Sequence, residues 1–359
     1  MAGTAGPKSP RGRGAVSNPT GRFERYFYET FDDGWGTKDP SPRKIETQVI
    51  PERTKSIIAR NDSPDVPFDQ SINPFKGCEH GCIYCFARPT HAYLGFSPGL
   101  DFEARIISKP EAPELLRREL ARPGYRCDVL ALGANTDPYQ PSEKRLELTR
   151  SILKVLEEHE HPVSIVTKSN LVLRDLDILA PMAEKQLAHV LVSVTTLDRS
   201  LARSMEPRAP TPERRIQALR SLHDAGVPVG ILASPMIPGL NDSELEAILE
   251  ACSDAGAVYA GYTLIRLPLE VKDLFVEWIE THYPTKAARV LGLIKETREG
   301  KLYDSDFSAR MSGTGQYAEL LGKRFAIACR RFDLNMNRLK LDTGRFRVPQ
   351  RKGDQAKLF

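Results

Sequence analysis

The sequence predicts an α/β fold in which parallel strands form a partial barrel or a doubly wound sheet. Short β-branched runs alternate with helical apolar patterns from about residue 67 onward, and about six such units can be counted. Strands that alternate with helices form parallel βαβ units with right-handed crossovers. No segment repeats at a period of 20–50 residues, which excludes a solenoid.

The expected strands are short apolar runs, which is typical of strands buried on both faces of a parallel sheet. They cover residues 128–134, 163–168, 187–196, 227–235 and 258–267, and a further strand with fewer apolar residues is expected near residues 68–73. In a parallel α/β barrel the active site lies at the carboxyl ends of the strands. We therefore expect functional side chains just beyond these runs.

The helices between the strands are predicted from apolar residues that recur every three to four positions. In residues 142–159 the apolar side chains fall roughly on one helix face. The helix at 211–225 begins with Thr-Pro-Glu, a capping residue followed by proline at the first helical position, and Gly226 ends it. Further helices are expected at 171–186, 243–254, 270–282, 285–298 and 316–331.

Composition divides the chain into four expected parts. Residues 1–22 are rich in Gly, Pro, Ser and Arg, and we expect them to be a disordered tail. An aromatic run begins at Phe23 and opens an N-terminal extension, residues 23–66, which should pack on the core. Residues 67–285 are the expected core domain, and residues 286–359 a helical and basic C-terminal extension.

Composition also excludes several classes of protein. The chain has 359 residues, of which 40% are hydrophobic and 27% charged, as in soluble globular proteins. Its longest uncharged apolar stretch, residues 226–240, contains three prolines and is too short to span a bilayer. The N-terminus lacks the apolar run of a signal peptide, and six cysteines are too few for a disulfide scaffold. We expect a cytoplasmic protein with no membrane partner.

Positive charge collects at both ends of the chain. Lys and Arg exceed Asp and Glu by four in residues 1–60 and by eight in residues 310–359, whereas residues 61–309 carry a net charge of −8. Basic ends suggest an anionic partner, and Phe332 and Phe346 could stack on the bases of a nucleic acid. Nucleic acid is therefore a candidate partner, and a pair of solvated tails is the alternative.

Three of the six cysteines, Cys78, Cys82 and Cys85, lie within eight residues. Three thiolates on one tight loop can bind a single inorganic centre, and three interpretations compete. A structural zinc ion needs a fourth ligand, for which His80 is available. An electron-transfer cluster normally takes four cysteines, whereas a four-iron cluster with three cysteine ligands leaves one iron open for catalysis.

The other three cysteines weaken the four-cysteine interpretation. Cys127, Cys252 and Cys329 each lie in or beside a predicted strand or helix. A lone cysteine in such a place is usually a small buried hydrophobic residue.

The open-iron interpretation agrees with a family resemblance. The C-x3-C-x2-C spacing of residues 78–85, with the aromatic Tyr84 before the last cysteine and a strand just ahead, resembles the signature of the radical S-adenosylmethionine (radical SAM) superfamily. The resemblance covers about residues 67–285 and implies a partial (β/α)6 TIM-like barrel of the radical SAM type. It also implies an enzyme whose cofactors are S-adenosylmethionine and a [4Fe-4S] cluster on three cysteines. An external electron donor such as a flavodoxin or ferredoxin would reduce the cluster, and a 5′-deoxyadenosyl radical would abstract hydrogen from the substrate.

The finer resemblance is to the branch that contains spore photoproduct lyase and a group of uncharacterised bacterial radical SAM proteins. The matching segments are residues 78–85, 135–141, 167–169, 193–196 and 235–242. The lyase is understood to return hydrogen from a cysteine near the end of its second barrel strand, whereas residues 132–137 here contain no cysteine. We therefore do not expect activity on spore photoproduct, and Tyr139, Tyr303 and Cys329 are the remaining candidate hydrogen donors.

The resemblance also implies cofactor contacts, residue by residue. Tyr84 resembles the residue whose backbone meets the adenine, and Ile237 lies in a run that forms an apolar wall for that ring. Asn135 and Thr136 end the second strand, where the superfamily binds the methionyl amino group. Lys168 resembles the lysine that pairs with the methionyl carboxylate.

Ser193 and Thr195 share one face of the fourth strand and could hydrogen-bond the ribose. Ordinary strand packing is the alternative for both residues, and an exposed position at a helix start is the alternative for Lys168. The sequence names no catalytic residue. Three classes of function remain open: a radical SAM enzyme acting on nucleic acid or a nucleotide, one acting on a protein or small molecule, and a non-catalytic iron–sulfur protein that relays electrons.

Overall fold

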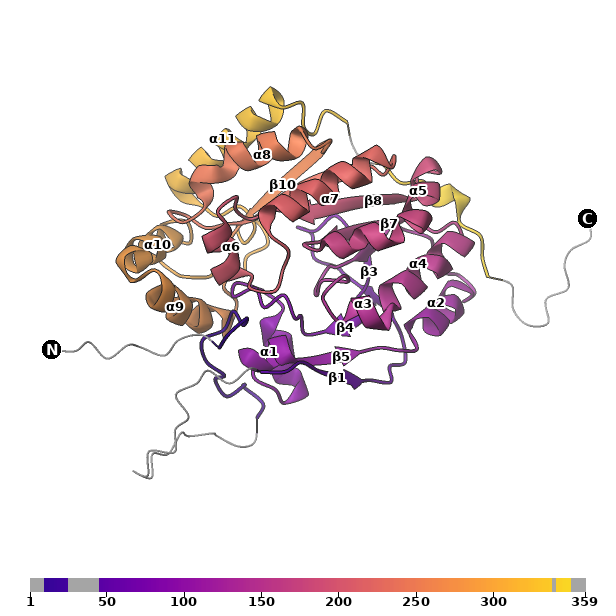
Figure 1. The fold of residues 1–359 in the computed structure, drawn as a ribbon, viewed down its shortest axis with the longest axis horizontal. Coiled ribbons are helices and arrows are strands. Elements are labelled where there is room, and N and C mark those ends of the chain that lie inside the picture. Colours follow the sequence, from indigo (N-terminus) through magenta and orange to yellow (C-terminus); the bar gives the residue numbers. More distant parts are fainter. Residues whose placement is uncertain (1–9, 25–44, 338–339, 350–359) are drawn as a thin grey trace, which may run out of the picture.

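Two sheets and a surrounding layer of helices make up the structure (Figure 1). It is a computed structural model that describes residues 10–24, 45–337 and 340–349. A seven-stranded sheet forms the centre, and a three-stranded sheet lies near its first parallel strand. No helix in these residues is long and apolar enough to cross a membrane.

The large sheet contains the six predicted parallel strands and one antiparallel edge strand. Its order is β10-β9-β8-β7-β6-β3-β2, and every neighbouring pair is parallel except β2 with β3. The strands are β2 (Ile58–Arg60), β3 (Gln70–Ile72), β6 (Leu130–Leu132), β7 (Val163–Thr167), β8 (Ala188–Ser193), β9 (Val229–Met236) and β10 (Tyr259–Leu264). Among the described residues β10 and β2 end the sheet without pairing to each other, so the barrel is partial, as predicted.

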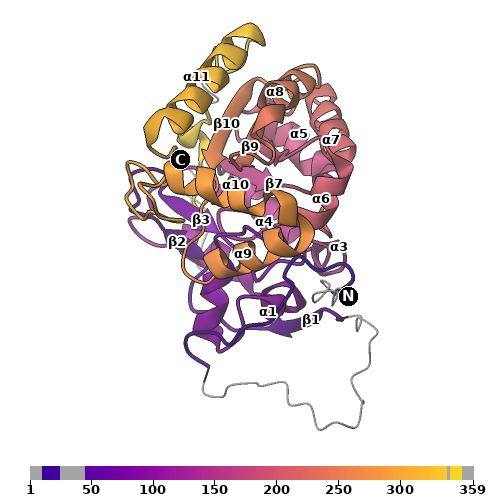
Figure 2. The same ribbon diagram turned by 90° about the vertical axis from the view of Figure 1, so that its left-hand side faces the viewer.

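Helices cover the outer face of this curved sheet, and α5, α7 and α8 pack directly on β8 and β9 (Figure 2). The α-helices are α1 (Leu100–Ala104), α2 (Ala112–Leu120), α3 (Glu143–Leu146), α4 (Leu148–Glu158), α5 (Leu176–Glu184), α6 (Arg199–Met205), α7 (Pro212–Asp224), α8 (Leu245–Ser253), α9 (Val271–His282), α10 (Pro284–Glu296) and α11 (Gly315–Arg331). Short 3-10 helices are η1 (Arg88–Leu94), η2 (Asn170–Asp175), η3 (Asp242–Glu244) and η4 (Thr343–Arg345). The helices predicted at 285–298 and 316–331 are confirmed as α10 and α11.

Alternate residues of the central strands have different surroundings. Val163 and Ile165 of β7, and Val190 and Val192 of β8, are buried in the main apolar core with side chains of the covering helices. Burying each such side chain contributes roughly 1.5–3 kcal/mol. The residues between them are only half-buried, although both strands are central. The inner face of the barrel is therefore less tightly filled than the outer face.

The helix predicted at 142–159 is divided at Glu147, whose φ is +50°. The Glu143 carboxylate accepts hydrogen bonds from the backbone N–H groups of Leu148 at 3.0 Å and Thr149 at 3.1 Å, and so caps the start of α4. Arg174 pairs with the same carboxylate at 2.9 Å. The apolar periodicity continues across the break, which is why the sequence predicted one helix.

The N-terminal segment differs from the disordered tail that composition suggested. Residues 1–9 lie outside the described residues, but Arg13 is only 4% exposed and its Nη1 donates to the carbonyl of Glu103 at 2.6 Å. The backbone N–H groups of Gly14 and Ala15 donate to the Glu103 carboxylate at 2.9 and 2.8 Å. Expecting disorder here was wrong, because one buried carboxylate fixes this backbone.

The N-terminal extension contributes strands to both sheets. Residues 25–44 lie outside the described residues. Beyond them, β1 (Gln48–Pro51) pairs with β5 (Arg105–Ser108), which also pairs with β4 (Phe75–Lys76), to form the small sheet. The sequence analysis predicted neither this sheet nor β2. Apart from the disorder expected in residues 10–22, the four-part division of the chain stays a prediction.

The described part of the basic C-terminal segment packs on the core. The ring of Phe346 lies 5.5 Å from the ring of Tyr125 and 5.2 Å from the ring of His161. Arg347 pairs with Glu160 at 2.9 Å. Phe346 therefore packs within the protein. It is not the free ring for base stacking that the sequence analysis suggested. Arg338, Arg351 and Lys352 of this basic segment lie outside the described residues.

Candidate functional site

The loop of Cys78, Cys82 and Cys85 follows β3 and β4, at the carboxyl end of the parallel sheet. Cys78 and Cys82 are buried, Cys85 is half-buried, and all three thiols are free. Burial raises the pKa of each thiol, to about 12 for Cys82. Without a metal these thiols are therefore neutral, and a bound metal is what would stabilise their thiolates. The loop suits a metal centre better than a nucleophile.

A buried ion pair holds the cysteine loop in shape. Arg88 pairs with Glu103 at 2.5 Å, and both side chains are fully buried. The Arg88 guanidinium also donates to the carbonyls of Cys82 at 2.9 Å and Gly81 at 3.2 Å. Gly81 has a φ of +67°, and a Cβ there would lie 2.7 Å from a Glu103 oxygen, so only glycine fits. The sequence analysis assigned no role to this pair.

The other cysteines lie elsewhere. Cys252 of α8 and Cys329 of α11 belong to the main core, and Cys127 precedes β6. In the part of the chain that the structure describes, no three His, Cys, Asp or Glu side chains are gathered closely enough to hold a single metal ion. His80 instead faces Asp137, with Nδ1 3.3 Å from Oδ2. This arrangement disfavours a zinc ion on the three cysteines and His80.

Asp137 connects three loops at this end of the sheet. Its Oδ1 accepts from the hydroxyl of Thr167 at 2.7 Å, and its Oδ2 from the backbone N–H of Lys168 at 2.7 Å. Burial alone would raise the pKa of Asp137, but the His80 ring and these hydrogen bonds outweigh burial and lower it to about 2. Asp137 lay in a matching segment of the sequence, but no role was predicted for it.

A second buried carboxylate lies behind Tyr84. The Tyr84 hydroxyl donates to Glu206, just after α6, and Arg215 of α7 pairs with the same carboxylate. All three side chains are buried. Arg215 also donates to the carbonyl of Ser193 at 3.2 Å, which connects the group to the end of β8. Burial alone would raise the pKa of Glu206, but Arg215 and Lys168 hold it below its ordinary value.

Lys168 follows β7 and is half-buried beside the cysteine loop. Its Nζ lies 5.8 Å from the centre of the Tyr84 ring. Among the described residues its ammonium has no hydrogen bond or salt bridge. Burial would lower the pKa of Lys168, but Cys82 and Glu206 outweigh burial and raise it. The site therefore holds a permanent cation with unused donors, which does not fit the alternative of an exposed lysine.

The ends of β8 and β9 hold a buried polar atom without a partner. Thr195 is 1% exposed, and within the described chain its Oγ1 makes no hydrogen bond. Asn241 donates to the carbonyls of Thr195 at 2.7 Å and Pro235 at 3.0 Å, and accepts from the N–H of Ile237 at 2.6 Å. Ser193, two residues before Thr195, is also buried. An orphaned buried hydroxyl calls for a ligand or water.

The remaining residues predicted to contact the cofactor differ in how much of their hydrogen-bonding capacity is unused. Ile237 is fully buried in the same apolar cluster as Tyr84 and Cys82. The Thr136 hydroxyl already donates to the carbonyl of Phe75 at 2.9 Å. Asn135 is half-buried, and only its backbone N–H has a partner in the described residues, the Asn73 side chain at 3.0 Å. Asn135 therefore has more free hydrogen-bonding capacity than Thr136.

Two of the three candidate hydrogen donors lie in the main core. Tyr139 is 1% exposed, and its hydroxyl donates to Asp175 at 3.1 Å. Cys329 is buried on α11 in the same core. Tyr303 is half-buried and packs against the apolar cluster that contains Cys82 and Tyr84. Tyr303 therefore shares an apolar cluster with the cysteine loop, whereas Tyr139 and Cys329 belong to the main core.

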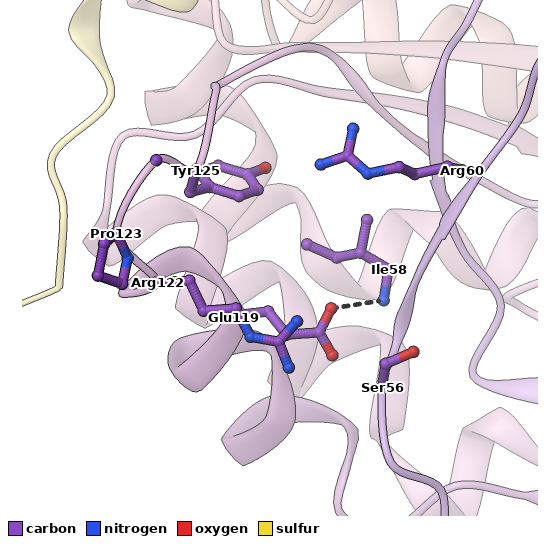
Figure 3. Close-up of a pocket in the computed structure, with 8 residues that line it drawn as sticks. Ser56, Ile58, Arg60, Glu119, Arg122, Pro123 and Tyr125 are labelled. Atoms are coloured by element: carbon purple, nitrogen blue, oxygen red, sulfur yellow. Dashed lines mark hydrogen bonds between the residues drawn. The ribbon is translucent and has the colours of Figure 1, made fainter.

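A pocket of about 270 Å³ lies away from this site, at the amino end of the parallel strands (Figure 3). Arg60, Arg122, Glu119 and Tyr125 are among the residues that line it. The Glu119 carboxylate accepts from the backbone N–H of Ile57 at 2.6 Å. The amino end of an α/β barrel usually serves stability, and this pocket contains none of the predicted site residues.

Comparison with known proteins gives one family match and several relatives. The family described as the radical SAM superfamily matches residues 72–252. An uncharacterized protein of Mycobacterium tuberculosis is 38% identical over 228 residues, which are 62% of this chain and 66% of that protein. The match thus spans just under two thirds of the relative. An uncharacterized protein of Methanocaldococcus jannaschii is 29% identical over 241 residues, 67% of this chain and 85% of that protein.

Among solved structures, spore photoproduct lyase has a similar fold. Its complex with dinucleoside spore photoproduct superposes with a TM-score of 0.53 at 16% identity and covers 79% of both chains. A mutant of the same lyase with bound AdoMet and the dinucleoside gives a TM-score of 0.51 at 17% identity, covering 79% of this chain and 78% of that one. Identities this low establish a shared fold and nothing finer.

Proposed function

This chain belongs to the radical SAM superfamily, and we propose that Cys78, Cys82 and Cys85 hold a [4Fe-4S] cluster whose remaining iron is open to S-adenosylmethionine. When bound, the two cofactors supply reductive cleavage of a C–S bond and a 5′-deoxyadenosyl radical that abstracts hydrogen from the substrate. Enzymes of this family need an external electron donor, for which we propose a flavodoxin or ferredoxin.

The donor set supports this proposal. The three free thiols lie on one loop, and none of the other cysteines belongs to the same apolar clusters. A four-iron cluster is larger than one ion, so its ligands stand further apart than the ligands of zinc. That fits thiols which are near one another but do not converge on a single-ion site.

The unpaired ammonium of Lys168 is the observation that carries the proposal. Lys168 is half-buried and its charge is favoured by Glu206, but no carboxylate contacts its ammonium directly, so its donors are free to bind an anion. The methionyl carboxylate is such an anion, and Lys168 lies beside Cys82, as their electrostatic coupling indicates. In this proposal Lys168 binds and orients the carboxylate, while Asn135 accepts a hydrogen bond from the methionyl amino group.

The other end of the cofactor would meet Thr195, Ser193, Tyr84 and Ile237. The free hydroxyl of Thr195 supports a hydrogen bond to the ribose. Tyr84 and Ile237 belong to one apolar cluster, which supports a dry wall for the adenine. Glu206 would act through Tyr84 as a positioning residue, because it accepts the Tyr84 hydroxyl, and Arg215 would hold the Glu206 carboxylate in place.

The test is anaerobic reconstitution of the full chain with iron and sulfide, followed by reduction in the presence of S-adenosylmethionine. We expect about four irons per chain and release of 5′-deoxyadenosine, measured by chromatography and mass spectrometry. Iron incorporation without cleavage of S-adenosylmethionine would contradict the proposal and leave the electron-relay function. Failure to incorporate iron would remove both functions.

For the substrate we propose a nucleic acid. The excess of eight positive charges in residues 310–359 supports this class, as does the complex of the structurally similar spore photoproduct lyase with dinucleoside spore photoproduct. The absence of cysteine from residues 132–137 supports a reaction different from that of the lyase. Tyr303 is the hydrogen donor we propose, since it packs against the apolar cluster that contains Cys82 and Tyr84. Added oligonucleotide should stimulate 5′-deoxyadenosine release; stimulation by a protein or small molecule instead would contradict this choice.

A further inference from the structure

An arginine at the end of the last strand contacts the cysteine loop. Arg266 follows β10, and its guanidinium lies 5.2 Å from the centre of the Phe86 ring. Phe86 directly follows Cys85 and is 44% exposed. The pair therefore joins the loop after the first parallel strand to the end of the last one, at the rim of the candidate site.

Most hydrogen-bonding capacity of Arg266 is unused. Its Nη1 contacts the Sδ of Met311 at 3.5 Å, and sulfur is a weak acceptor. Its Nε is buried and has no partner in the described part of the chain. No carboxylate of residues 10–24, 45–337 or 340–349 lies within salt-bridge distance of the guanidinium. A planar group with five donors is thus held half-buried without an acceptor of matching charge.

The charges around Arg266 do not neutralise it. Arg298 is buried nearby and donates only to backbone carbonyl groups. Burial lowers the pKa of Arg298, and the nearby Arg266 lowers it further, although Asp304 acts in the opposite direction. Arg310 is paired with Asp65. Three guanidinium groups, those of Arg266, Arg298 and Arg310, therefore share two nearby carboxylates, Asp65 and Asp304, and this part of the rim keeps an excess of positive charge.

We propose that Arg266 and Phe86 form a subsite for an oxyanion of the substrate, a phosphate or a carboxylate, with an adjoining planar group against the Phe86 ring. Arginine binds such oxyanions through two parallel hydrogen bonds, and flat rings stack on phenylalanine. The subsite rests on the proposed function only in taking this rim as the substrate entrance. It is separate from Lys168, which would hold the cofactor.

The test measures binding of four probes to the full, reconstituted chain by calorimetry: inorganic phosphate, acetate, thymidine 5′-monophosphate and thymidine. We expect an oxyanion to bind and the monophosphate to bind more tightly than thymidine. Preference for phosphate or for acetate distinguishes the two sources of the oxyanion. Arg266→Gln should weaken oxyanion binding at least about tenfold, the effect of losing a hydrogen bond to a charged group, and Arg266→Lys should weaken it less.

Two further variants make the test specific. Phe86→Leu should weaken binding of the monophosphate but not of inorganic phosphate, because it removes only the ring. Arg118→Gln removes an equal charge from the exposed surface of α2 and should leave every affinity unchanged. Thermal unfolding of each variant checks that it is folded.

The subsite is overturned if wild type binds none of the probes, or if folded Arg266→Gln binds them as tightly as wild type. The same samples are assayed for 5′-deoxyadenosine. Probe binding without cleavage of S-adenosylmethionine would overturn the proposed function and leave the subsite standing. Cleavage of S-adenosylmethionine together with unchanged probe affinities in Arg266→Gln would overturn the subsite and leave the proposed function standing.

Discussion

The ammonium of Lys168 lies 5.8 Å from the centre of the Tyr84 ring, and in the described structure no acidic side chain pairs with it. A cation above a ring is favourable by about 0.5–2 kcal/mol, which is less than a hydrogen-bonded carboxylate would add. The arrangement thus leaves the lysine available to an anionic ligand.

Lys168→Ala should weaken binding of S-adenosylmethionine by about 1.5–3 kcal/mol, the range for a hydrogen bond to a charged group. The iron content should remain, because Lys168 is not a cluster ligand. Titration and iron analysis on the same sample measure both. Lys154→Ala, on the exposed face of α4, is the matched control and should change neither. Unchanged affinity of Lys168→Ala for S-adenosylmethionine would show that the lysine does not contact the cofactor.

Replacing any one of Cys78, Cys82 and Cys85 by Ala should abolish the brown, oxygen-sensitive cluster, because each supplies one of three thiolates. Replacing Cys252 or Cys329 should leave iron binding intact, since both lie in the main core. Iron and sulfide analysis after anaerobic reconstitution measures the difference. If one of the core cysteines proves necessary for iron binding, the proposal that one iron has an open coordination position is wrong.

Glu206→Gln should destabilise the fold by about 3–5 kcal/mol, because Arg215 would remain buried without a negative partner. Urea unfolding monitored by circular dichroism measures this loss. Tyr84→Phe keeps the ion pair and removes only the hydroxyl, so its effect should be about 1–3 kcal/mol. Equal stabilities of Glu206→Gln and wild type would show that the pair contributes little to holding Tyr84 in place.

Local patterns predicted most of the parallel strands well, because each of β6 to β10 is one short apolar run followed by helical segments. The break at Glu147 was missed, since it depends on the Glu143 carboxylate reaching the next turn. The small sheet was also missed, because β1 and β5 are far apart in the chain and neither run is strongly apolar.

The site shows the same division between local and long-range signals. Cysteine spacing and strand ends pointed to the cysteine loop, Lys168 and Thr195 without any tertiary information. The buried carboxylates Glu103 and Glu206 are invisible to such patterns, because each is recognised only through an arginine elsewhere in the fold. A charged residue is read as exposed until its partner is known.

Buried histidines predict a fall in stability below neutral pH. Burial lowers the pKa of His91, His161 and His189 to about 4, from an ordinary value near 6.5. The unfolded chain therefore binds more protons than the folded chain between pH 6.5 and 4. Stability is full above pH 6.5 and declines as pH falls through this window, by up to about 1.4 kcal/mol per pH unit for each histidine.

Urea unfolding at several pH values between 7 and 4.5 measures this decline. His161→Gln should make the dependence shallower by up to about one third, because His91 and His189 contribute similar amounts and the lowered pKa of His159 adds a further contribution. The loss of its bond to the Tyr125 hydroxyl shifts the whole curve but not its slope. An unchanged slope would show that His161 does not carry part of this pH dependence.

Salt dependence tests whether the basic C-terminal region binds nucleic acid. If about six phosphates are neutralised, affinity for an oligonucleotide should fall about 10³-fold between 50 and 200 mM salt. Deleting residues 338–359 would also remove Phe346 from its contacts with Tyr125 and His161, so a smaller deletion is cleaner. Deleting residues 350–359 removes three basic side chains and one acidic side chain and keeps Phe346.

The slope of log affinity against log salt should flatten in this deletion variant by up to about 2.7 on duplex DNA and about 2.1 on single strands. Binding is measured by fluorescence anisotropy on both kinds of oligonucleotide. No binding at low salt, or a slope untouched by the deletion, would contradict a role for this region and leave the protein or small-molecule class of substrate.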